Sequence, residues 1–298
     1  MTADRSFLLT EQRLAASMNL DSLSIEEAVA LLHAQDRAAV EAVGREQGAI
    51  AAAVRIVVEQ LRRGGRLIYI GAGTSGRLGI LDASECPPTF RTDPSMVQGI
   101  IAGGDVAIRK SVEGAEDSPA GGAAAIDEKN VGGNDVVMGI AAGGTTPYVR
   151  GALARARELG AKTIFFCCVE KFADEPAVDV VIRPLVGPEV VTGSTRMKAG
   201  TATKLVLNAI TTITMVQLGK VYENLMVDMR ATNAKLRDRA ARIVATLTGL
   251  AREEAFAWVD KADGHVKLAI LMYKRKLSRE QAAAALEAAG GQLRAALG

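Results

Sequence analysis

Short and almost wholly apolar runs recur along the middle of the chain, and stretches with helical periodicity separate them. Such runs are typical of parallel strands that are buried on both faces. Strands that alternate with helices predict an α/β fold with a doubly wound, mostly parallel sheet flanked by helices. The predicted strands are Leu67–Ile70, Val97–Ala102, Asp135–Ile140, Thr163–Cys168 and Val178–Ile182.

The two ends of the chain have helical patterns without strands. Ser24 and Glu27 form a capping-box pattern, which predicts a helix from there toward Val43. We expect three parts: an N-terminal helical arm (1–48), an α/β domain (49–222) and a small helical C-terminal domain (223–298). The remaining predicted helical stretches are Ala49–Arg63, Arg196–Leu218, Ala251–Lys261, Val266–Tyr273 and Gln281–Ala288.

Composition excludes several classes of function. Lys and Arg exceed Asp and Glu by only two, which is not typical of a nucleic-acid-binding protein. The chain has no signal-peptide pattern and no apolar run of transmembrane length, so we expect a cytoplasmic protein without membrane contact. Its three cysteines lack metal-ligand spacing and it has two histidines, so we expect no metal and no cofactor. Acid–base chemistry then falls to carboxylates.

Two glycine-rich segments follow predicted strands and lead into helices. Glycines and small hydroxyls at a helix N-terminus are typical of phosphate sites, because backbone N–H groups and the helix dipole favour an anion there. The first segment also matches G-x-G-x-x-G, but no acidic residue ends the next strand, so a phosphosugar is favoured over a dinucleotide. The candidate substrate-binding residues are Gly73, Thr74, Ser75, Gly76 and Arg77 in the first segment and Gly143, Gly144, Thr145 and Thr146 in the second.

A third hydroxyl-rich segment precedes the predicted helix that begins near Arg196. Ser194, Thr195 and Lys198 are its candidate binding residues. Basic side chains are unfavourable near a helix N-terminus, so a bound anion would explain Lys198 better than an ordinary cap does. An ordinary N-cap is the alternative interpretation.

Two glutamates are the candidate acid and base. Glu85 precedes Cys86-Pro87-Pro88, so we expect it at the exit of a short helix near the carboxyl ends of the strands. Glu116 follows the next predicted strand and its helix. Paired in loops at one edge of the sheet, the two carboxyls can serve as general acid and general base.

Several long segments resemble the N-acetylmuramic acid 6-phosphate etherases. The resemblance covers nearly the whole chain. The segments are Thr10-Glu11, Leu20–Asp36, Arg66–Thr89, Val112–Ser118, Val186–Thr201 and Asn224–Asp228.

The resemblance implies a sugar isomerase (SIS) domain, a homodimer with sites near the subunit interface, and a role in peptidoglycan recycling. It also implies a reaction that yields N-acetylglucosamine 6-phosphate and D-lactate. Glu85 matches the family's catalytic acid and Glu116 its second catalytic glutamate, with Glu113 close by in sequence. The second glycine-rich segment departs from the family's Ala-Ser-Gly-Arg-Thr-Pro, because Gly143 lacks a hydroxyl and Thr145 replaces a basic side chain.

A lactyl ether on C3 can leave by elimination once the sugar ring is open, because the C1 aldehyde acidifies the C2 proton. The hypothesis gives Glu116 the role of C2 base and Glu85 the role of the acid that later activates water, although the reverse assignment stays open. Two other functions remain as alternatives: a non-catalytic regulator similar to the glucokinase regulatory protein, and an aldose–ketose phosphate isomerase. Release of lactate distinguishes the three.

Overall fold

The structure, a computed structural model, describes residues 6–229, 231 and 234–298. The chain divides into two compact units. The first comprises Met1–Ser84 with Pro94–Thr211, and the second comprises Glu85–Asp93 with Thr212–Gly298. The domain boundary expected near residue 223 stays a prediction.

A five-stranded parallel sheet forms the centre of the first unit. The strand order is β2-β1-β3-β4-β5, so the chain winds outward in both directions from β1 and β3. All five predicted strands are confirmed to within a few residues. They are β1 (Leu67–Gly71), β2 (Val97–Ile101), β3 (Val136–Ile140), β4 (Lys162–Phe166) and β5 (Val180–Ile182).

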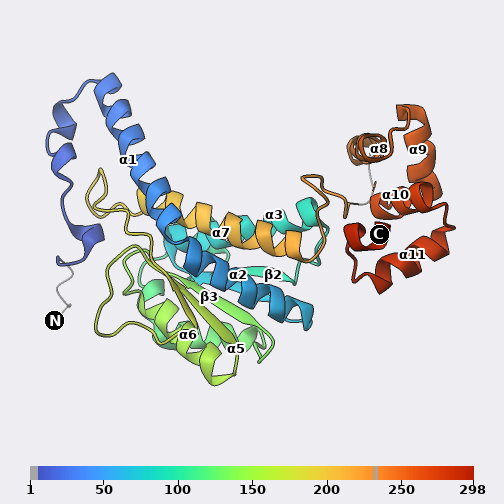
Figure 1. Cartoon of the computed structure of the whole chain (residues 1–298). Helices are drawn as coiled ribbons and strands as arrows, with labels where there is room; N and C mark the ends of the chain where they lie inside the picture. The colour runs from blue at the N-terminus through green and yellow to red at the C-terminus, as the bar shows by residue number, and fades with distance from the viewer. Residues whose placement is uncertain (1–5, 230, 232–233) are drawn as a thin grey trace. The chain divides into compact units, whose positions relative to one another are not determined.

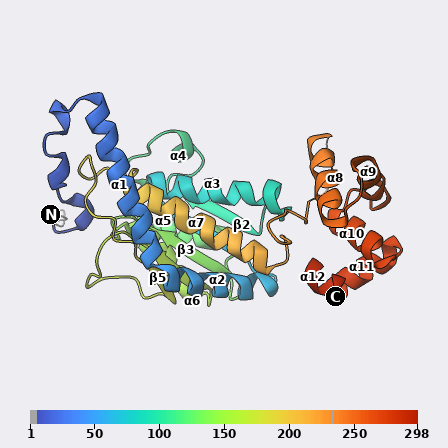
Figure 2. The same ribbon diagram turned by 45° about the horizontal axis from the view of Figure 1, so that its top comes forward.

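Helices cover both faces of this sheet, as an α/β fold requires. On one face, α5 (Pro119–Glu128) and α6 (Pro147–Glu158) pack on the side chains of alternate strand residues. The opposite face carries α2 (Gln47–Arg62), α3 (Gly73–Phe90) and α7 (Lys198–Gln217) (Figures 1 and 2).

Close packing of helices on the sheet depends on two glycines. A Cβ on Gly79 of α3 would lie 2.8 Å from the Cβ of Tyr69, and a Cβ on Gly139 of β3 would lie 2.7 Å from Leu153 of α6. Each glycine therefore lets a helix approach the sheet on its own face.

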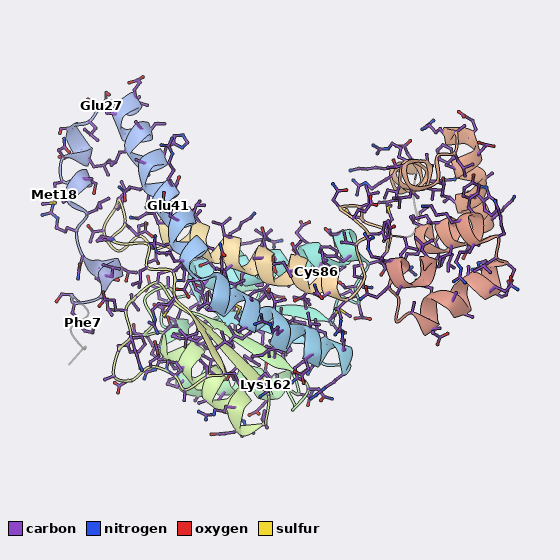
Figure 3. The ribbon with its side chains drawn as sticks, in the orientation of Figure 1. Phe7, Met18, Glu27, Glu41, Cys86 and Lys162 are labelled. Atoms are coloured by element: carbon purple, nitrogen blue, oxygen red, sulfur yellow. The ribbon has the colours of Figure 1, made fainter. Side chains whose placement is uncertain are left out.

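The N-terminal part begins with three short 3₁₀ turns, η1 (Leu9–Glu11), η2 (Ala15–Ser17) and η3 (Leu20–Ser22), followed by α1 (Ile25–Arg45). The predicted capping box is confirmed: the Glu27 N–H donates to the Ser24 hydroxyl at 3.2 Å, and the Ser24 N–H donates to the Glu27 carboxylate at 2.8 Å. Figure 3 labels Phe7, two residues before η1, and Glu27 and Glu41 along α1.

The second unit has its own apolar core, to which its helices contribute buried residues. The three predicted helical pieces of the tail are confirmed, and two further helices join them. In order they are α8 (Ala234–Thr248), α9 (Arg252–Lys261), α10 (Val266–Arg275), α11 (Arg279–Ala288) and α12 (Leu293–Leu297). Over the described ranges, no helix combines the length and the apolar character that a membrane span requires.

Candidate active site

The two glycine-rich segments leave the sheet side by side. Gly71, the last residue of β1, is the register partner of Ile140, the last residue of β3, and these two strands are neighbours. The helix after β1 covers one face of the sheet and the helix after β3 covers the other. This is the switch point of a doubly wound sheet, where the loops diverge and ligands bind.

The first segment turns into α3 almost at once. Only Ala72 separates β1 from Gly73, where the helix begins with a φ of +51°. Thr74 and Ser75 lie half-buried in the first turn. The first-turn N–H groups of α3 and two hydroxyls therefore lie together at the carboxyl edge of β1, an arrangement that suits phosphate binding.

The second segment leads into α6 through a tight turn. The Gly144 N–H donates to the Ala141 carbonyl at 2.8 Å, and Gly144 has a φ of +77°. Thr146 is the N-cap of α6, yet its side chain makes no capping hydrogen bond. The first-turn N–H groups of α6 thus receive no cap from Thr146, which suits an external anion.

Gly200, near the start of α7, lies beside both the third segment and the first. A Cβ on Gly200 would lie 3.7 Å from both the Thr74 Cγ2 and the Thr195 carbonyl oxygen. Thr195 and Thr74, predicted from distant parts of the sequence, are therefore neighbours.

The N-terminus of α7 already holds an anion that belongs to the chain. The buried Glu189 carboxylate accepts the backbone N–H groups of Lys198 and Ala199, each at 3.0 Å. Glu189 therefore supplies a negative charge at the start of α7, and an external anion beside Lys198 stays a prediction. Binding by Ser194 and Thr195 stays a prediction.

The Lys198 side chain is buried and directed at the N-terminal part of the chain. Its Nζ donates to the Gln35 Oε1 on α1 at 2.8 Å. Burial lowers the pKa of Lys198, and the negative charges of Glu189 and Asp36 oppose that shift. Lys198 thus joins α7 to α1, and its contact with substrate stays a prediction.

Arg77 also has a partner within the chain. Its guanidinium donates to the carbonyl oxygens of Ala107 at 2.8 Å and Ile108 at 2.9 Å, both in the short helix α4 (Val106–Arg109). Arg77 therefore holds the segment after β2 against α3, in addition to any contact it makes with substrate.

A pocket of about 260 Å³ lies beside the first segment. Glu113 and Glu116 line it together with Gly73 and Arg77. Glu116 belongs to the 3₁₀ turn η4 (Ala115–Asp117), and both glutamates are exposed. The structure thus brings the predicted base to the predicted phosphate segment, with Glu113 lining the same pocket.

The expected position of Glu85 was wrong. Helix α3 does not end at Cys86 but continues through Pro87 and Pro88 to Phe90. Glu85 therefore lies inside a helix, twelve residues after Gly73, or about 18 Å along the axis at 1.5 Å per residue. Glu85 is exposed and does not line the pocket that contains Glu116.

Buried side chains explain why α3 tolerates the two prolines. Cys86 and Phe90, four residues apart on one side of the helix, are both buried. The Arg91 N–H still donates to the Pro87 carbonyl at 2.9 Å. Burial of this face holds the last turn although each proline removes one helical hydrogen bond.

Two N-terminal residues that were not candidate site residues meet the predicted binding segments. The Thr10 Oγ1 lies 3.7 Å from the position of a Cβ on Gly143, and the Glu11 Oε2 lies 3.3 Å from that of a Cβ on Gly193. In the sequence, the one signal for these residues was that Thr10-Glu11 is among the segments that resemble the family. The resemblance does not give either residue a role.

Comparison with known proteins decides the family. The chain is 54% identical over 294 residues to the N-acetylmuramic acid 6-phosphate etherase of Gloeobacter violaceus, covering 99% of this chain and 96% of the relative. It is 53% identical to the enzyme of that name from Synechocystis sp., with the same coverage. The chain belongs to the N-acetylmuramic acid 6-phosphate etherase family.

Two further matches agree with the fold. Residues 49–157 match the glucokinase regulatory protein N-terminal SIS domain, so the expected SIS-type fold is confirmed. A Bacteroides fragilis protein described as a phosphosugar isomerase involved in capsule formation superposes with a TM-score of 0.50 at 21% identity, over 67% of this chain and 95% of that one. Within the described residues, no group of three or more His, Cys, Asp or Glu side chains has an arrangement suited to a metal ion.

Proposed function

We propose that this chain cleaves the lactyl ether of N-acetylmuramic acid 6-phosphate, giving N-acetylglucosamine 6-phosphate and D-lactate. The family membership supports this reaction, and the names of its relatives specify the substrate. The structural observation that carries it is the register pairing of Gly71 with Ile140, from which the two glycine-rich segments start side by side. Gly73 of the first segment lines a pocket together with Glu113 and Glu116. The proposed setting is peptidoglycan recycling in the cytoplasm.

The phosphate anchors the substrate at the helix N-termini. Thr74 and Ser75 offer hydroxyls, and the first-turn N–H groups of α3 add donors in the same direction. Binding energy from this unreacting end of the sugar holds C2 and C3 in place for the chemistry.

The reaction balances as an elimination followed by addition of water. In the open-chain sugar, a carboxylate removes the C2 proton, the electron pair forms the C2–C3 double bond, and the C3–oxygen bond breaks as an acid protonates the departing lactate. Water then adds its oxygen to C3 and the C2 proton is restored, so one water is consumed. Glu116 is the base in this scheme and Glu85 the acid.

Glu85 reaches such a site only from another copy of the chain. Glu85 lies twelve residues after Gly73 in helix α3 and does not line the pocket that contains Gly73 and Glu116. A homodimer in which each copy lends Glu85 to the other pocket resolves this conflict. An exposed apolar stripe on α1 supports self-association: Ile25, Val29 and Leu32 are 79%, 47% and 36% exposed.

Mixed dimers test the sharing of sites. Glu85→Gln and Glu116→Gln are each expected to be inactive, and refolding them together forms mixed dimers. If the site is shared, each mixed dimer has one intact site, and random pairing restores about a quarter of wild-type activity. No recovery in the mixture, with mixed dimers demonstrated by mass spectrometry, would show that both carboxyls act within one chain or that Glu85 has another role.

Release of D-lactate tests the function itself. The purified chain is expected to release D-lactate from N-acetylmuramic acid 6-phosphate in the presence of a chelator, and far more slowly from the unphosphorylated sugar. An isomerase or a sensing protein of the same fold would bind sugar phosphates and release no lactate. Activity that is lost on chelation and restored by a divalent ion would overturn the metal-free scheme.

A further inference from the structure

The hydroxyl of Thr10 is buried and has no partner among the residues that the structure describes. Thr10 is 0% exposed, and its Oγ1 makes no hydrogen bond to any of these residues. A buried hydroxyl that is left unpaired destabilises the protein that contains it, so such groups usually have a partner. The position of this hydroxyl indicates what that partner is.

The hydroxyl lies against the second glycine-rich segment. Among the described residues other than Gly143 and its two chain neighbours, Thr10 Oγ1 is the only heavy atom within 4 Å of the position of a Cβ on Gly143, at 3.7 Å. Gly143 itself has no side chain and contributes no hydroxyl to the segment. Thr10 therefore places a donor where the segment before α6 lacks one.

Packing holds Thr10 in this place. Leu8, two residues earlier, is 4% exposed and belongs to the apolar core between the sheet and helices α5 and α6. Phe172 packs against the same core. Phe172 also packs against the second segment, because a Cβ on Gly144 would lie 2.8 Å from its ring. The 3₁₀ turn η1 and the segment Ala141–Thr146 thus pack against common neighbours, which hold Thr10 beside Gly143.

We propose that the Thr10 hydroxyl donates a hydrogen bond to the phosphate of the substrate, so that the N-terminal turn η1 is part of the phosphate site. This inference rests on the proposed function and extends it to a residue outside the sheet loops. The ligand oxygen supplies the acceptor that the free protein lacks. Thr10 and the N-terminal groups of α6 then contact the anion from different sides.

Two substitutions at this position test the inference. Thr10→Val keeps the shape of the side chain and removes the hydroxyl, whereas Thr10→Ser keeps the hydroxyl. For N-acetylglucosamine 6-phosphate titrated into the full chain, Thr10→Val is expected to raise Kd about 10- to 100-fold, and Thr10→Ser by less than about 3-fold. Thr10→Val is also expected to raise the Tm of the free protein, since it removes an unpaired buried hydroxyl.

Opposite effects on stability and binding separate this role from a structural one. A Thr10→Val protein that is less stable and binds as wild type does would overturn the inference, as would equal losses in Thr10→Val and Thr10→Ser. Inorganic phosphate as a competing ligand tests the group contacted: its inhibition constant should rise in Thr10→Val. An unchanged constant for inorganic phosphate, with weaker binding of the sugar phosphate, would assign Thr10 to a sugar hydroxyl and overturn the phosphate contact.

Failure of the proposed function has a different signature. If the proposed function is wrong, neither the wild-type chain nor the Thr10 variants release lactate. A wild-type chain that releases lactate, beside a Thr10→Val variant with an unchanged KM, would remove only the role of Thr10.

Discussion

Glu189 caps helix α7 by accepting the backbone N–H of Lys198 at 3.0 Å with one carboxylate oxygen, while the other oxygen accepts the N–H of Ala199. Glu189 is completely buried, so the hydrogen bonds from these two N–H groups replace those that its carboxylate would make to water. The negative charge also lies at the positive end of the helix dipole. This contact fixes the end of the third predicted binding segment.

Loss of this cap should destabilise the protein. Glu189→Ala leaves two buried N–H groups unpaired, so we expect the free energy of unfolding to fall by about 2–4 kcal/mol. Glu189→Gln retains one carbonyl oxygen as an acceptor, so its free energy of unfolding should lie between those of Glu189→Ala and wild type. Urea denaturation measures the effect. Glu41→Ala, on the exposed part of α1, is the control and should stay within about 0.5 kcal/mol of wild type.

Arg66 and Asp135 should make stability depend on pH. The Arg66 guanidinium and backbone N–H donate to the Asp135 carboxylate at 2.6 to 3.0 Å. Burial alone would raise the pKa of Asp135, but hydrogen bonds from Arg66 and Gly132 outweigh burial and hold the pKa below its ordinary value of 3.8.

A carboxyl with a lowered pKa stabilises the fold above its ordinary pKa, and the contribution is lost as the pH falls through the folded value. Asp135→Asn should therefore reduce the free energy of unfolding by about 1.5–3 kcal/mol at neutral pH. The difference from wild type should shrink as the pH falls below 3.8 and the wild-type carboxyl takes up a proton. A constant difference across this range, measured by urea denaturation, would contradict the assignment.

The parts of the fold that depend on local pattern could be predicted. The strands follow from continuous apolar runs, and the start of α1 follows from Ser24 and Glu27. The end of α3 could not be predicted, because Pro87 and Pro88 locally favour termination. What keeps the helix intact is the burial of Cys86 and Phe90, which depends on tertiary packing.

The candidate site, too, could be predicted where local pattern decides and not where tertiary contacts decide. Glycines and hydroxyls identified two segments that the sheet brings together. The partner of Lys198 was missed because Glu189 lies nine residues away, in a segment without regular structure, and no periodicity relates the two. Thr10 was missed because its contact with Gly143 spans more than a hundred residues of sequence.

Glu113 and Glu116 line one pocket, so exchange of the C2 proton should distinguish them. If Glu116 is the base, Glu116→Gln should lose exchange of the C2 proton with solvent deuterium and should lose turnover by at least about 100-fold. Glu113→Gln is the matched control and should keep exchange. An active Glu116→Gln variant beside an inactive Glu113→Gln variant would move the base to Glu113.

Thr74 and Ser75 should act through binding of the phosphate. Thr74→Ala and Ser75→Ala each remove a hydroxyl from the first turn of α3, and a hydrogen bond to a charged group contributes about 1.5–3 kcal/mol. We expect KM for the phosphorylated substrate to rise about 10- to 100-fold. The slow reaction of the unphosphorylated sugar should be nearly unaffected. Equal turnover of the two sugars by wild type would remove the anchoring argument.

Gly143→Ser should give the Thr10 hydroxyl a partner in the free protein. The site has room for a Cβ, since its nearest neighbour would be Thr10 Oγ1 at 3.7 Å, and Gly143 does not have a positive φ. A serine hydroxyl at this position can turn to within hydrogen-bond distance of Thr10. We therefore expect Gly143→Ser to raise the free energy of unfolding by about 1 kcal/mol, beyond the few tenths expected from the loss of a glycine.

The double variant decides whether this gain comes from Thr10. In a Thr10→Val background, Gly143→Ser has no hydroxyl to pair with, so only the backbone contribution should remain and the coupling energy should be about 0.5–1.5 kcal/mol. The new hydroxyl also lies beside the phosphate segment, so the double variant should regain part of the affinity that Thr10→Val loses. Additive stabilities in urea denaturation would show that the two positions do not interact. An affinity no better than that of Thr10→Val would show that a hydroxyl at this point of the second segment does not serve the phosphate.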